Sequence, residues 1–506
     1  MGVQRYWLLL VLIDLCPFLS GAVGDISPYI KHYEGLSYDR EDLHKMHLRA
    51  RRATQPQEHT LQLDFTAFHR TFRLRLRRNA AAFSQTFMVV SENGSTSADL
   101  SHIYSGILEG EHGSACHGSV LQGQFEGTIH TDNGTYHIES VHRYNSSQTD
   151  HHSIIYHEDD MILPPMRPGP DGFCGAEHLN VLAQSLRPKE VGHTVSTYVL
   201  IQIPSSCPCN FHPQEAAASR TRRTVDESKT SCLLHLHVDH LYFKRFKSVE
   251  AVVAQVINTL TKQDISNSNQ DFIFNFRIDV MTEEDKNDPL NPLFIGPETL
   301  LSLYSEKNWG NFCLSYLLTN RDYSGVLGLA WEGKTGNWGG ICSKQTTLRN
   351  GQTATLNTGL VTIQNFGQFL PTRLVQLTFA HELGHSLGSP HDEGSNCGNL
   401  GSSGGKGRYL MFPHATDEVR ENNEKFSHCS IKHISKMLKL KKDDCFVVSN
   451  QPICGNQIVE KDEECDVGHN DTDPCCYSAK EPVGVQCRLK PGKVCRLLWG
   501  CVNVKI

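Results

Sequence analysis

One short stretch of the chain carries the residue types that a metal-dependent hydrolase requires. Residues 381–391 read HELGHSLGSPH. Because residues four apart lie on one face of a helix, His381 and His385 can direct two imidazole rings at one metal ion. Gly388 can adopt the left-handed conformation that ends a helix sharply, and that turn would return His391 as a third ligand. The spacing predicts one catalytic zinc ion bound by three histidines.

This ligand set predicts the hydrolysis of peptide bonds. Three neutral imidazoles leave a fourth coordination position for water, whose pKa zinc lowers to about 7. Glu382 follows the first ligand and is placed to accept the proton of that water and then deliver it to the leaving amine. A short His-Glu-x-x-His match also occurs by chance among hydrogen-bonded core histidines. The extended spacing, with the glycine and the third histidine, favours the metal site.

The residues around the motif predict the elements that position it. Residues 374–387 contain no proline, and Val375 and Phe379 place apolar side chains on the face opposite the histidines. Twenty residues beyond His391, Met411 lies in an apolar stretch. In isolation such a methionine is more often a core residue. In the metzincin class, however, a Met-turn lies beneath the three imidazoles, and we expect Met411 to form it.

Two other polar clusters could be mistaken for sites. His235, His237 and His240 lie close together in the sequence, but we expect no acid–base partner near them. We interpret them as strand residues rather than as metal ligands. The acidic run Glu283–Asp285 could supply paired carboxylates, but Lys286 follows it directly, which is typical of a solvated loop.

Composition limits the class of protein. The chain of 506 residues corresponds to about three domains. A net charge of −7 argues against a nucleic-acid binder, which would show a concentrated basic surface. The contents of 39% hydrophobic and 20% charged residues are typical of globular protein. Eighteen cysteines indicate the disulfide framework of a protein made in the secretory pathway.

The N-terminus agrees with secretion. Arg5 precedes the apolar run Trp7–Ile13, and small residues lead to Ala22, which predicts a signal peptide over residues 1–22. A fortuitous apolar start is the alternative. No later stretch approaches the 18 apolar residues of a spanning helix, so we expect no membrane span and a secreted chain as written. The candidate N-glycosylation sites are Asn93, Asn133, Asn145 and Asn470.

A basic cluster marks the clearest boundary. Arg220, Arg222 and Arg223 follow Ala- and Ser-rich sequence, which predicts an exposed segment that a proprotein convertase cuts after Arg223. A solvated charge run is the alternative. Arg49–Arg52 has the same shape and is a candidate secondary cut. We therefore expect a prodomain over residues 23–223, a metalloprotease domain over 224–449 and a short cysteine-dense segment over 450–506.

Periodicity predicts the character of each domain. The first shows mostly period-two alternation, which predicts a β-rich domain, and the second mixes helices with strands. The expected strands are at 61–65, 72–76, 124–131, 153–157, 272–280 and 312–318, and the expected helices at 249–260 and 432–440. The last segment is loop-rich and should depend on its disulfides.

A zinc protease that is activated by removal of a prodomain must be kept inactive until the prodomain is cleaved. A prodomain thiolate can occupy the open coordination position, and Cys174 in the glycine-flanked loop 172–176 is the candidate. Cys207 and Cys209 compete for this role, and Cys116 is a further possible partner. Without Cys16 of the signal peptide, 17 cysteines are left, of which four lie in the prodomain, six in the metalloprotease domain and seven beyond. Six can pair completely, whereas seven cannot.

These features together resemble the disintegrin-and-metalloprotease family, in the adamalysin (reprolysin) branch of the metzincins. Asp392, directly after His391, separates that branch from the matrix metalloproteases. The chain is most similar to the Kuzbanian (alpha-secretase) type, over about residues 25 to 495. The segments that carry this similarity are 33–38, 155–160, 325–331, 388–392 and 451–455.

The resemblance implies a multidomain fold: a β-rich prodomain, an α/β metzincin zinc-protease domain and a small disulfide-rich, disintegrin-like segment. It implies zinc binding by the three histidines, catalysis by Glu382, a Met-turn at Met411 and a cysteine switch at Cys174. It also implies the disulfide pairs Cys232–Cys313, Cys342–Cys445 and Cys397–Cys429. The edge strand along which an extended substrate pairs would comprise Val326, Leu327, Gly328, Leu329, Ala330 and Trp331. Family substrates are membrane-protein ectodomains cut near the membrane, which implies ectodomain shedding and a part in Notch signalling.

The C-terminal segment departs from the family pattern. The family has another cysteine directly after Asp466, where this chain has Val467, and at least one further cysteine before Pro474 is absent. The chain as written ends at Ile506 without a membrane helix. Besides a secreted zymogen, an incomplete or spliced form of a membrane-anchored sheddase is therefore an alternative. A catalytically silent binding or decoy protein is the rival from another class.

Overall fold

A computed structural model gives the fold. It describes residues 26–52, 60–78, 88–91, 94–97, 99–144, 150–162, 229–260, 273–282, 288–292, 294–392, 397, 406–413, 420, 422–448, 463–467, 471–478, 481, 485–491, 493–496 and 500–503. We call residues 26–162 the N-terminal unit and residues 229–448 the metalloprotease unit. The expected signal peptide, Cys174, the basic cluster at 220–223 and the acidic run at 283–285 lie outside the described residues.

The N-terminal unit is built on an antiparallel sheet in the order β1-β10-β9-β8-β7-β6-β3-β2. Its elements are β1 (Glu34–Leu36), α1 (Arg40–Arg52), β2 (Leu61–Ala67), β3 (Arg70–Arg78), β6 (Ile103–Leu108), β7 (Ala115–Leu121), β8 (Gln124–Thr131), β9 (Gly134–Ser140), η1 (Val141–Tyr144), β10 (Ser153–His157) and η2 (Glu158–Asp160). Strand β2 alternates buried and exposed residues along its whole length, as the period-two pattern predicts. The prediction of a β-rich first domain is confirmed.

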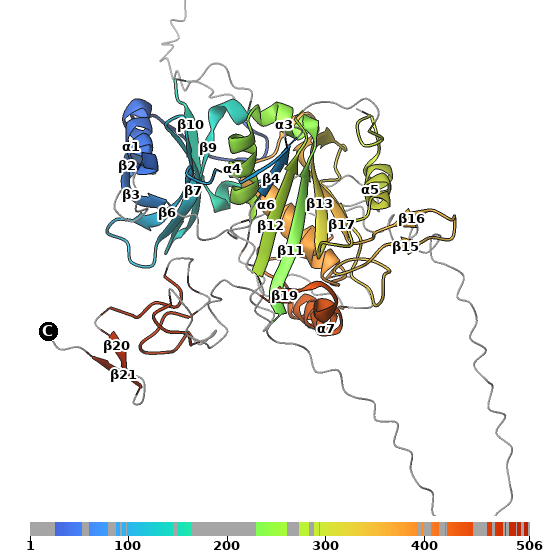
Figure 1. Ribbon diagram of the computed structural model, residues 1–506. Helices are drawn as coiled ribbons and strands as arrows, with labels where there is room; N and C mark the ends of the chain where they lie inside the picture. The colour runs from blue at the N-terminus through green and yellow to red at the C-terminus, as the bar shows by residue number, and fades with distance from the viewer. Residues whose placement is uncertain are drawn as a thin grey trace, which may run out of the picture.

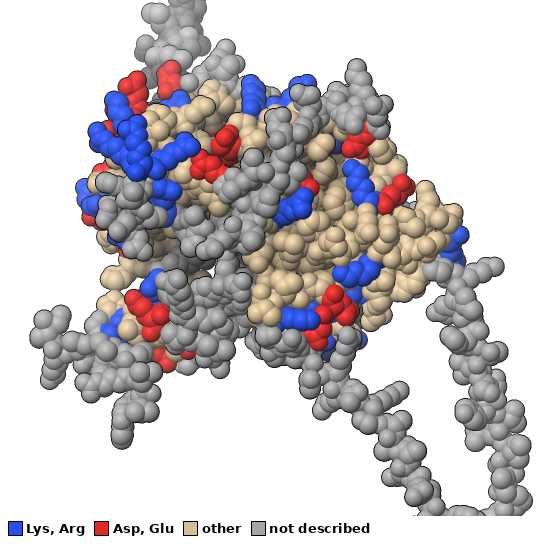
Figure 2. Space-filling view, viewed as in Figure 1, with Lys and Arg blue, Asp and Glu red and all other residues tan. Residues whose placement is uncertain are grey.

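The candidate secondary cut at Arg49–Arg52 stays a prediction, but the structure shows a helix there and not the expected extended segment. These residues form the last turn of α1, where Ala50 is buried and its carbonyl accepts a hydrogen bond from Arg78 Nη1 at 3.0 Å. A protease needs an extended segment, and a packed helix end does not offer one. Figure 2 shows Lys and Arg side chains gathered over the region of α1 and the neighbouring strands.

The metalloprotease unit contains a mostly parallel sheet between helices (Figure 1). Its strands are β11 (Lys229–Val238), β12 (Ile273–Val280), β13 (Leu314–Asp322), β14 (Gly328–Ala330), β15 (Thr346–Thr347), β16 (Thr353–Ala354), β17 (Thr358–Asn365), β18 (Gln368–Phe369) and β19 (Val447–Val448). Its helices are α3 (His240–Phe246), α4 (Val249–Leu260), α5 (Pro297–Glu306), α6 (Thr372–Ser386) and α7 (His428–Cys445). Helix α4 has the predicted bounds, whereas α7 extends beyond the predicted residues 432–440 at both ends.

Alternating residues of β13 show how the two faces of this sheet are covered. Leu317 lies in an apolar cluster with Tyr304 of α5. Tyr316 points the other way, and its ring lies 4.9 Å from that of Phe379 in α6. Helix α6 therefore packs on one face of the sheet and α5 on the opposite face, which fixes the position of the zinc-binding motif relative to the strands.

A hairpin of the N-terminal unit extends the protease sheet. The strands β4 (Met88–Ser91) and β5 (Gly94–Ser97) follow β12 in the order β14-β17-β13-β11-β12-β4-β5. Strand β4 pairs in parallel with β12, with Ile278 opposite Val89 and Asp279 opposite Val90. The two units therefore share main-chain hydrogen bonding, which the period-two pattern of the sequence did not indicate.

The C-terminal segment is small and loop-rich, as expected. The disulfide Cys465–Cys476 crosslinks it, and its last described part is the hairpin of β20 (Lys493–Arg496) and β21 (Gly500–Asn503). Among all described residues of the chain, no helix combines the length and apolar character needed to cross a bilayer.

Candidate metal centre and active site

Helix α6 and the turn after it bring the three predicted histidines together. His385 Nε2 lies 3.2 Å from His381 Nε2 and 3.1 Å from His391 Nε2. Gly388 ends the helix with a φ of +96°, the left-handed conformation that the sequence predicts. A tetrahedron with zinc–nitrogen distances of ~2.0–2.1 Å has edges of ~3.3–3.4 Å. The three nitrogens are therefore spaced as ligands of one zinc ion.

Backbone carbonyls orient two of these rings. His381 Nδ1 lies 2.8 Å from the carbonyl oxygen of Leu410, and His385 Nδ1 lies 2.9 Å from that of Ser389. A carbonyl oxygen can only accept, so each Nδ1 carries the proton and each Nε2 presents its lone pair. Burial lowers the pKa of His381 to about 4 and the pKa of His385 well below its ordinary value. Neutral imidazoles with fixed tautomers fit a zinc ion.

Met411 lies beneath the helix that carries the ligands. Its side chain is fully buried, and a Cβ atom placed on Gly384 would come within 2.4 Å of Met411 Sδ. The backbone N–H of Asp392 donates to the carbonyl of Met411 at 2.9 Å. The predicted Met-turn residue therefore packs against the helix and is tied by its backbone to the residue that follows His391.

Asp392 connects the motif to α7. Its carboxylate Oδ1 accepts hydrogen bonds from the hydroxyls of Ser427 at 2.5 Å and Ser430 at 3.1 Å. Burial raises the pKa of Asp392, although the two hydroxyl groups oppose that shift. Ser427 also caps α7, because its hydroxyl accepts from the N–H of Ser430. The position of His391 is thus coupled to the start of this helix.

Glu382 lies between the histidines and the edge of the sheet. The residue is fully buried, and a Cβ on Gly328 would lie 2.6 Å from both its Cγ and its Oε1. Gly328 begins β14, which pairs antiparallel with β17 and is the outermost strand at this end of the described sheet. The close approach requires glycine at position 328. The resemblance implies a place for Gly328 in the edge strand, but no local pattern of the sequence indicates its contact with Glu382.

The predicted edge strand is shorter in the structure than in the sequence analysis. Residues 328–330 form β14, and Leu327 precedes it with its carbonyl accepting from the N–H of Thr362 at 3.0 Å. Trp331 follows β14 and donates its indole N–H to Ser305 Oγ at 2.9 Å. Val326 is half-buried before the strand. A residue on each side thus anchors the strand that lies beside Glu382.

Three disulfides fix the loops of the metalloprotease unit. The structure pairs Cys232 with Cys313, Cys342 with Cys445 and Cys397 with Cys429, which are the pairs that the resemblance implies. The first joins β11 to the residue before β13, and the other two attach loops to the two ends of α7. Helix α7, to which Asp392 is hydrogen-bonded, is therefore crosslinked by a disulfide near each of its ends.

The cluster around His235 contains a partner that the sequence did not reveal. His235 is buried in β11, with Nε2 3.0 Å from Asp279 Oδ2 and Nδ1 2.7 Å from Ser315 Oγ. These residues come from the two strands that flank β11. The reason given for discounting these histidines, the lack of a nearby acid, is therefore wrong. The interpretation of His235 and His237 as strand residues agrees with their place in β11, but it is wrong for His240, which is the first residue of α3.

Most predicted modification sites lie outside the described residues. These are Cys174, Arg220, Arg222, Arg223, Asn93, Asn145 and Asn470. Asn133 is described, and it is exposed in the turn between β8 and β9.

Comparison with known families agrees with this arrangement. Residues 251–440 match the model of the reprolysin-like M12B metallopeptidase family, and residues 27–120 match the model of the reprolysin family propeptide. The first match contains the three histidines and Glu382, and the second lies in the N-terminal unit.

Individual relatives extend the similarity along the chain. The chain is 43% identical over 518 residues to the disintegrin and metalloproteinase domain-containing protein 10 of Bos taurus, covering 96% of this chain and 67% of that protein. It is 43% identical over 507 residues to the protein of that name from Homo sapiens, covering 94% and 66%. A Caenorhabditis elegans homolog of the same name is 29% identical over 577 residues, covering 98% and 61%. The chain spans about two thirds of the length of these relatives.

Proposed function

Because the chain belongs to the M12B reprolysin family of zinc metalloendopeptidases, we propose that it is made as a zymogen and cleaves the ectodomains of membrane proteins. The observation that supports this proposal is the arrangement of the site. Three imidazole nitrogens lie close together, the buried carboxylate of Glu382 follows the first histidine in sequence, and the edge strand β14 lies beside that carboxylate. His381, His385 and His391 hold the zinc ion, and Glu382 acts as general base.

Each protein group has a separate task in the proposed reaction. When bound, zinc polarises the scissile carbonyl and lowers the pKa of a coordinated water to about 7. Glu382 accepts the proton of the attacking water on its carboxylate and then donates it to the leaving amine nitrogen. An extended substrate pairs with residues 326–331, whose outer edge offers main-chain groups for strand addition. Strand pairing holds the scissile bond beside the carboxylate while side-chain pockets select the substrate.

We further propose that the chain matures by two cleavages, removal of its signal peptide and a cut that separates its prodomain. A signal peptide over residues 1–22 directs it to the secretory pathway, and a proprotein convertase cuts after Arg223 in the cluster of Arg220, Arg222 and Arg223. Cys174 holds the zinc site closed until then. The domains are a prodomain over 23–223, a metalloprotease domain over 224–449 and a disintegrin-like segment over 450–506, with glycans at Asn93, Asn133, Asn145 and Asn470.

Cleavage of a quenched peptide library tests this function. The protein is cut after Arg223, loaded with zinc and compared with Glu382→Ala and with Glu306→Gln, which changes an exposed carboxylate of α5 in the metalloprotease unit. We expect activity that a zinc chelator abolishes, that Glu382→Ala lacks and that Glu306→Gln retains. No activity from folded, zinc-loaded protein freed of its prodomain would overturn the proposal and favour a binding protein.

A further inference from the structure

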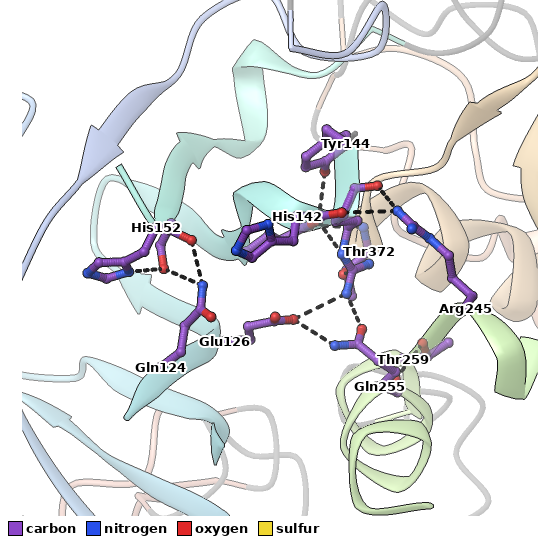
Figure 3. Close-up of polar contacts among 12 residues, drawn as sticks. Gln124, Glu126, His142, Tyr144, His152, Arg245, Gln255, Thr259 and Thr372 are labelled. Atoms are coloured by element: carbon purple, nitrogen blue, oxygen red, sulfur yellow. Dashed lines mark hydrogen bonds and ion pairs between the residues drawn. The ribbon is translucent and has the colours of Figure 1, made fainter. Parts of the chain in front are cut away.

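Different parts of the molecule contact the two ends of α6, the helix that carries His381 and His385. At its start, Glu139 Oε1 accepts from the backbone N–H of Thr372 at 2.9 Å, and Arg143 donates to Thr372 Oγ1 at 2.8 Å. Both belong to the N-terminal unit, in a network of polar contacts around the start of the helix (Figure 3). At its end, α6 contacts the metalloprotease unit itself. The histidines lie in the second half of the helix, so the contacts at its end bear most directly on them.

The end of α6 packs against residues 332–343, which follow the edge strand and which we call the 332–343 loop. The backbone N–H of Gly333 donates to the carbonyl of His385 at 2.7 Å, and that of Ile341 donates to the carbonyl of Ser386 at 2.8 Å. The last four carbonyls of a helix lack partners within the helix. The loop supplies donors to two of them, and one of these two carbonyls belongs to a proposed zinc ligand.

Two glycines allow the loop to lie directly on the turn that follows α6. A Cβ atom on Gly333 would come within 2.7 Å of the backbone of both Ser386 and Gly388. A Cβ atom on Gly340 would lie 2.4 Å from the carbonyl oxygen of Ser386. Packing as close as this transmits displacement from one segment to the next. A shift of the loop would therefore move the turn at Gly388, which brings His391 to the site.

A buried lysine of α7 binds this loop. Lys441 is 3% exposed. Its Nζ donates to the carbonyl oxygens of Lys334 at 3.1 Å and Gly339 at 3.3 Å, and to Ser343 Oγ at 3.0 Å. Burial lowers the pKa of Lys441 to about 8, although the charge of Asp444 opposes that shift. The three neutral acceptors match the three N–H donors of an ammonium group, so the loop satisfies the charged form of the side chain.

The loop has a second connection to α7. The disulfide Cys342–Cys445 joins it to the last residue of that helix. This disulfide holds one end of the loop only, whereas Lys441 donates to residues near both ends. Burying an ammonium group costs free energy, so a tether that the disulfide already supplies does not account for it. The lysine is explained if the position of the loop matters to the site on which the loop packs.

From these contacts we propose that Lys441 is a positioning residue for the zinc site. By holding the 332–343 loop against the end of α6, it fixes the carbonyl of His385 and the turn at Gly388, and with them the arrangement of the metal ligands. Lys441 acts through the loop and not by contact with the metal. The loop follows β14, so the same contacts connect the edge strand to the ligands. The inference rests on the proposed zinc site, but not on the substrate class.

Cobalt(II) in place of zinc tests this role, because its visible absorption changes with the geometry of its ligands. Every protein in the series is the full chain with Cys174→Ser, which removes the proposed thiol ligand. Lys441→Met keeps the length of the side chain but has no donor. We expect it to change the cobalt spectrum and to lose cobalt to a chelator at least about tenfold faster. Ser343→Ala removes one of the three acceptors and should have a smaller effect in the same direction, so it serves if Lys441→Met fails to fold.

Lys439→Met is the matched control, because Lys439 is an exposed lysine of the same helix. We expect it to keep the spectrum and the rate of cobalt loss of the otherwise unchanged protein. Urea unfolding of the same proteins separates positioning from stability. A Lys441→Met protein that is less stable but keeps both cobalt properties would overturn the inference, and so would equal effects of Lys439→Met and Lys441→Met. If the otherwise unchanged protein binds no cobalt, the proposed zinc site itself fails, and the inference fails with it.

Discussion

Gly328 approaches the carboxylate of Glu382 so closely that a β-carbon at position 328 would lie 2.6 Å from Glu382 Oε1. The first residue of the edge strand and the proposed general base therefore occupy adjoining space without room for one more methyl group. This contact links the strand that would bind substrate to the group that would move the proton.

The first prediction is that Gly328→Ala displaces Glu382. We expect kcat/KM for peptide cleavage to fall about 100-fold, because a misplacement of about 1 Å costs on that order. The zinc content should stay the same, since no ligand moves. Gly296→Ala is the matched control, because a β-carbon there meets nothing closer than 3.7 Å. Full activity of Gly328→Ala would contradict the proposed position of Glu382.

The second prediction concerns the packing beneath the ligands. Met411 is fully buried against α6, so Met411→Ala should leave a cavity and lower the free energy of unfolding by about 2–5 kcal/mol. Met411→Leu keeps most of the volume and should cost less than about 1.5 kcal/mol. Urea unfolding of the zinc-loaded proteins measures both values. Equal stability of the two variants would show that Met411 does not fill this space.

Local sequence patterns predicted the elements that make the candidate site. The periodicity of apolar residues predicted the bounds of α4 correctly. The spacing of the zinc-binding motif predicted both helix α6 and the turn at Gly388. These features depend on interactions between residues that are close in sequence, so they can be predicted from the sequence of a single chain. The same holds for β2, whose alternation follows from having one buried face.

The features that the sequence did not reveal join residues far apart in the chain. Asp279 lies beside His235 because two parallel strands have a particular register, and no local pattern states that register. Glu139 caps α6 across 233 residues of sequence. The helix at Arg49–Arg52 was missed for a related reason: the composition of the cluster suggested an extended segment, whereas the packing of Ala50 fixes a helix on which the three arginines are exposed.

The third prediction concerns acid stability. Burial, with the nearby charges of His235 and Lys307, lowers the pKa of His237 from 6.5 to about 3. The unfolded chain therefore binds a proton between these values that the folded chain does not bind, so stability falls as the pH drops through this range. The contribution is about 1.4 kcal/mol for each pH unit.

Urea unfolding at a series of pH values between 6.5 and 4 tests this dependence. His237→Phe removes this titrating group and should make the loss of stability across that window smaller, by about 1.4 kcal/mol for each pH unit. His112→Gln changes an exposed histidine and should leave the slope as it is in the unchanged protein. A slope that His237→Phe does not alter would assign the acid sensitivity to other groups.

The last prediction concerns Asp392, which joins the third ligand to α7. Asp392→Asn keeps the shape of the side chain but removes the negative charge that accepts from Ser427 and Ser430. Substitution of a residue that orients a metal ligand without binding the metal itself typically lowers metal affinity by about 10- to 100-fold. We therefore expect weaker zinc binding, measured by competition with a chelating dye, and a matching loss of activity at limiting zinc that excess zinc restores.

A second substitution separates orientation of the ligand from capping of the helix. Ser430→Ala removes one hydroxyl donor to Asp392 but leaves Ser427, whose hydroxyl accepts from the backbone N–H at position 430 and so caps α7. We expect a smaller loss of zinc affinity than for Asp392→Asn, with little change in stability. Unchanged zinc affinity in Asp392→Asn, together with lower stability, would mean that Asp392 supports α7 and does not hold His391 in place.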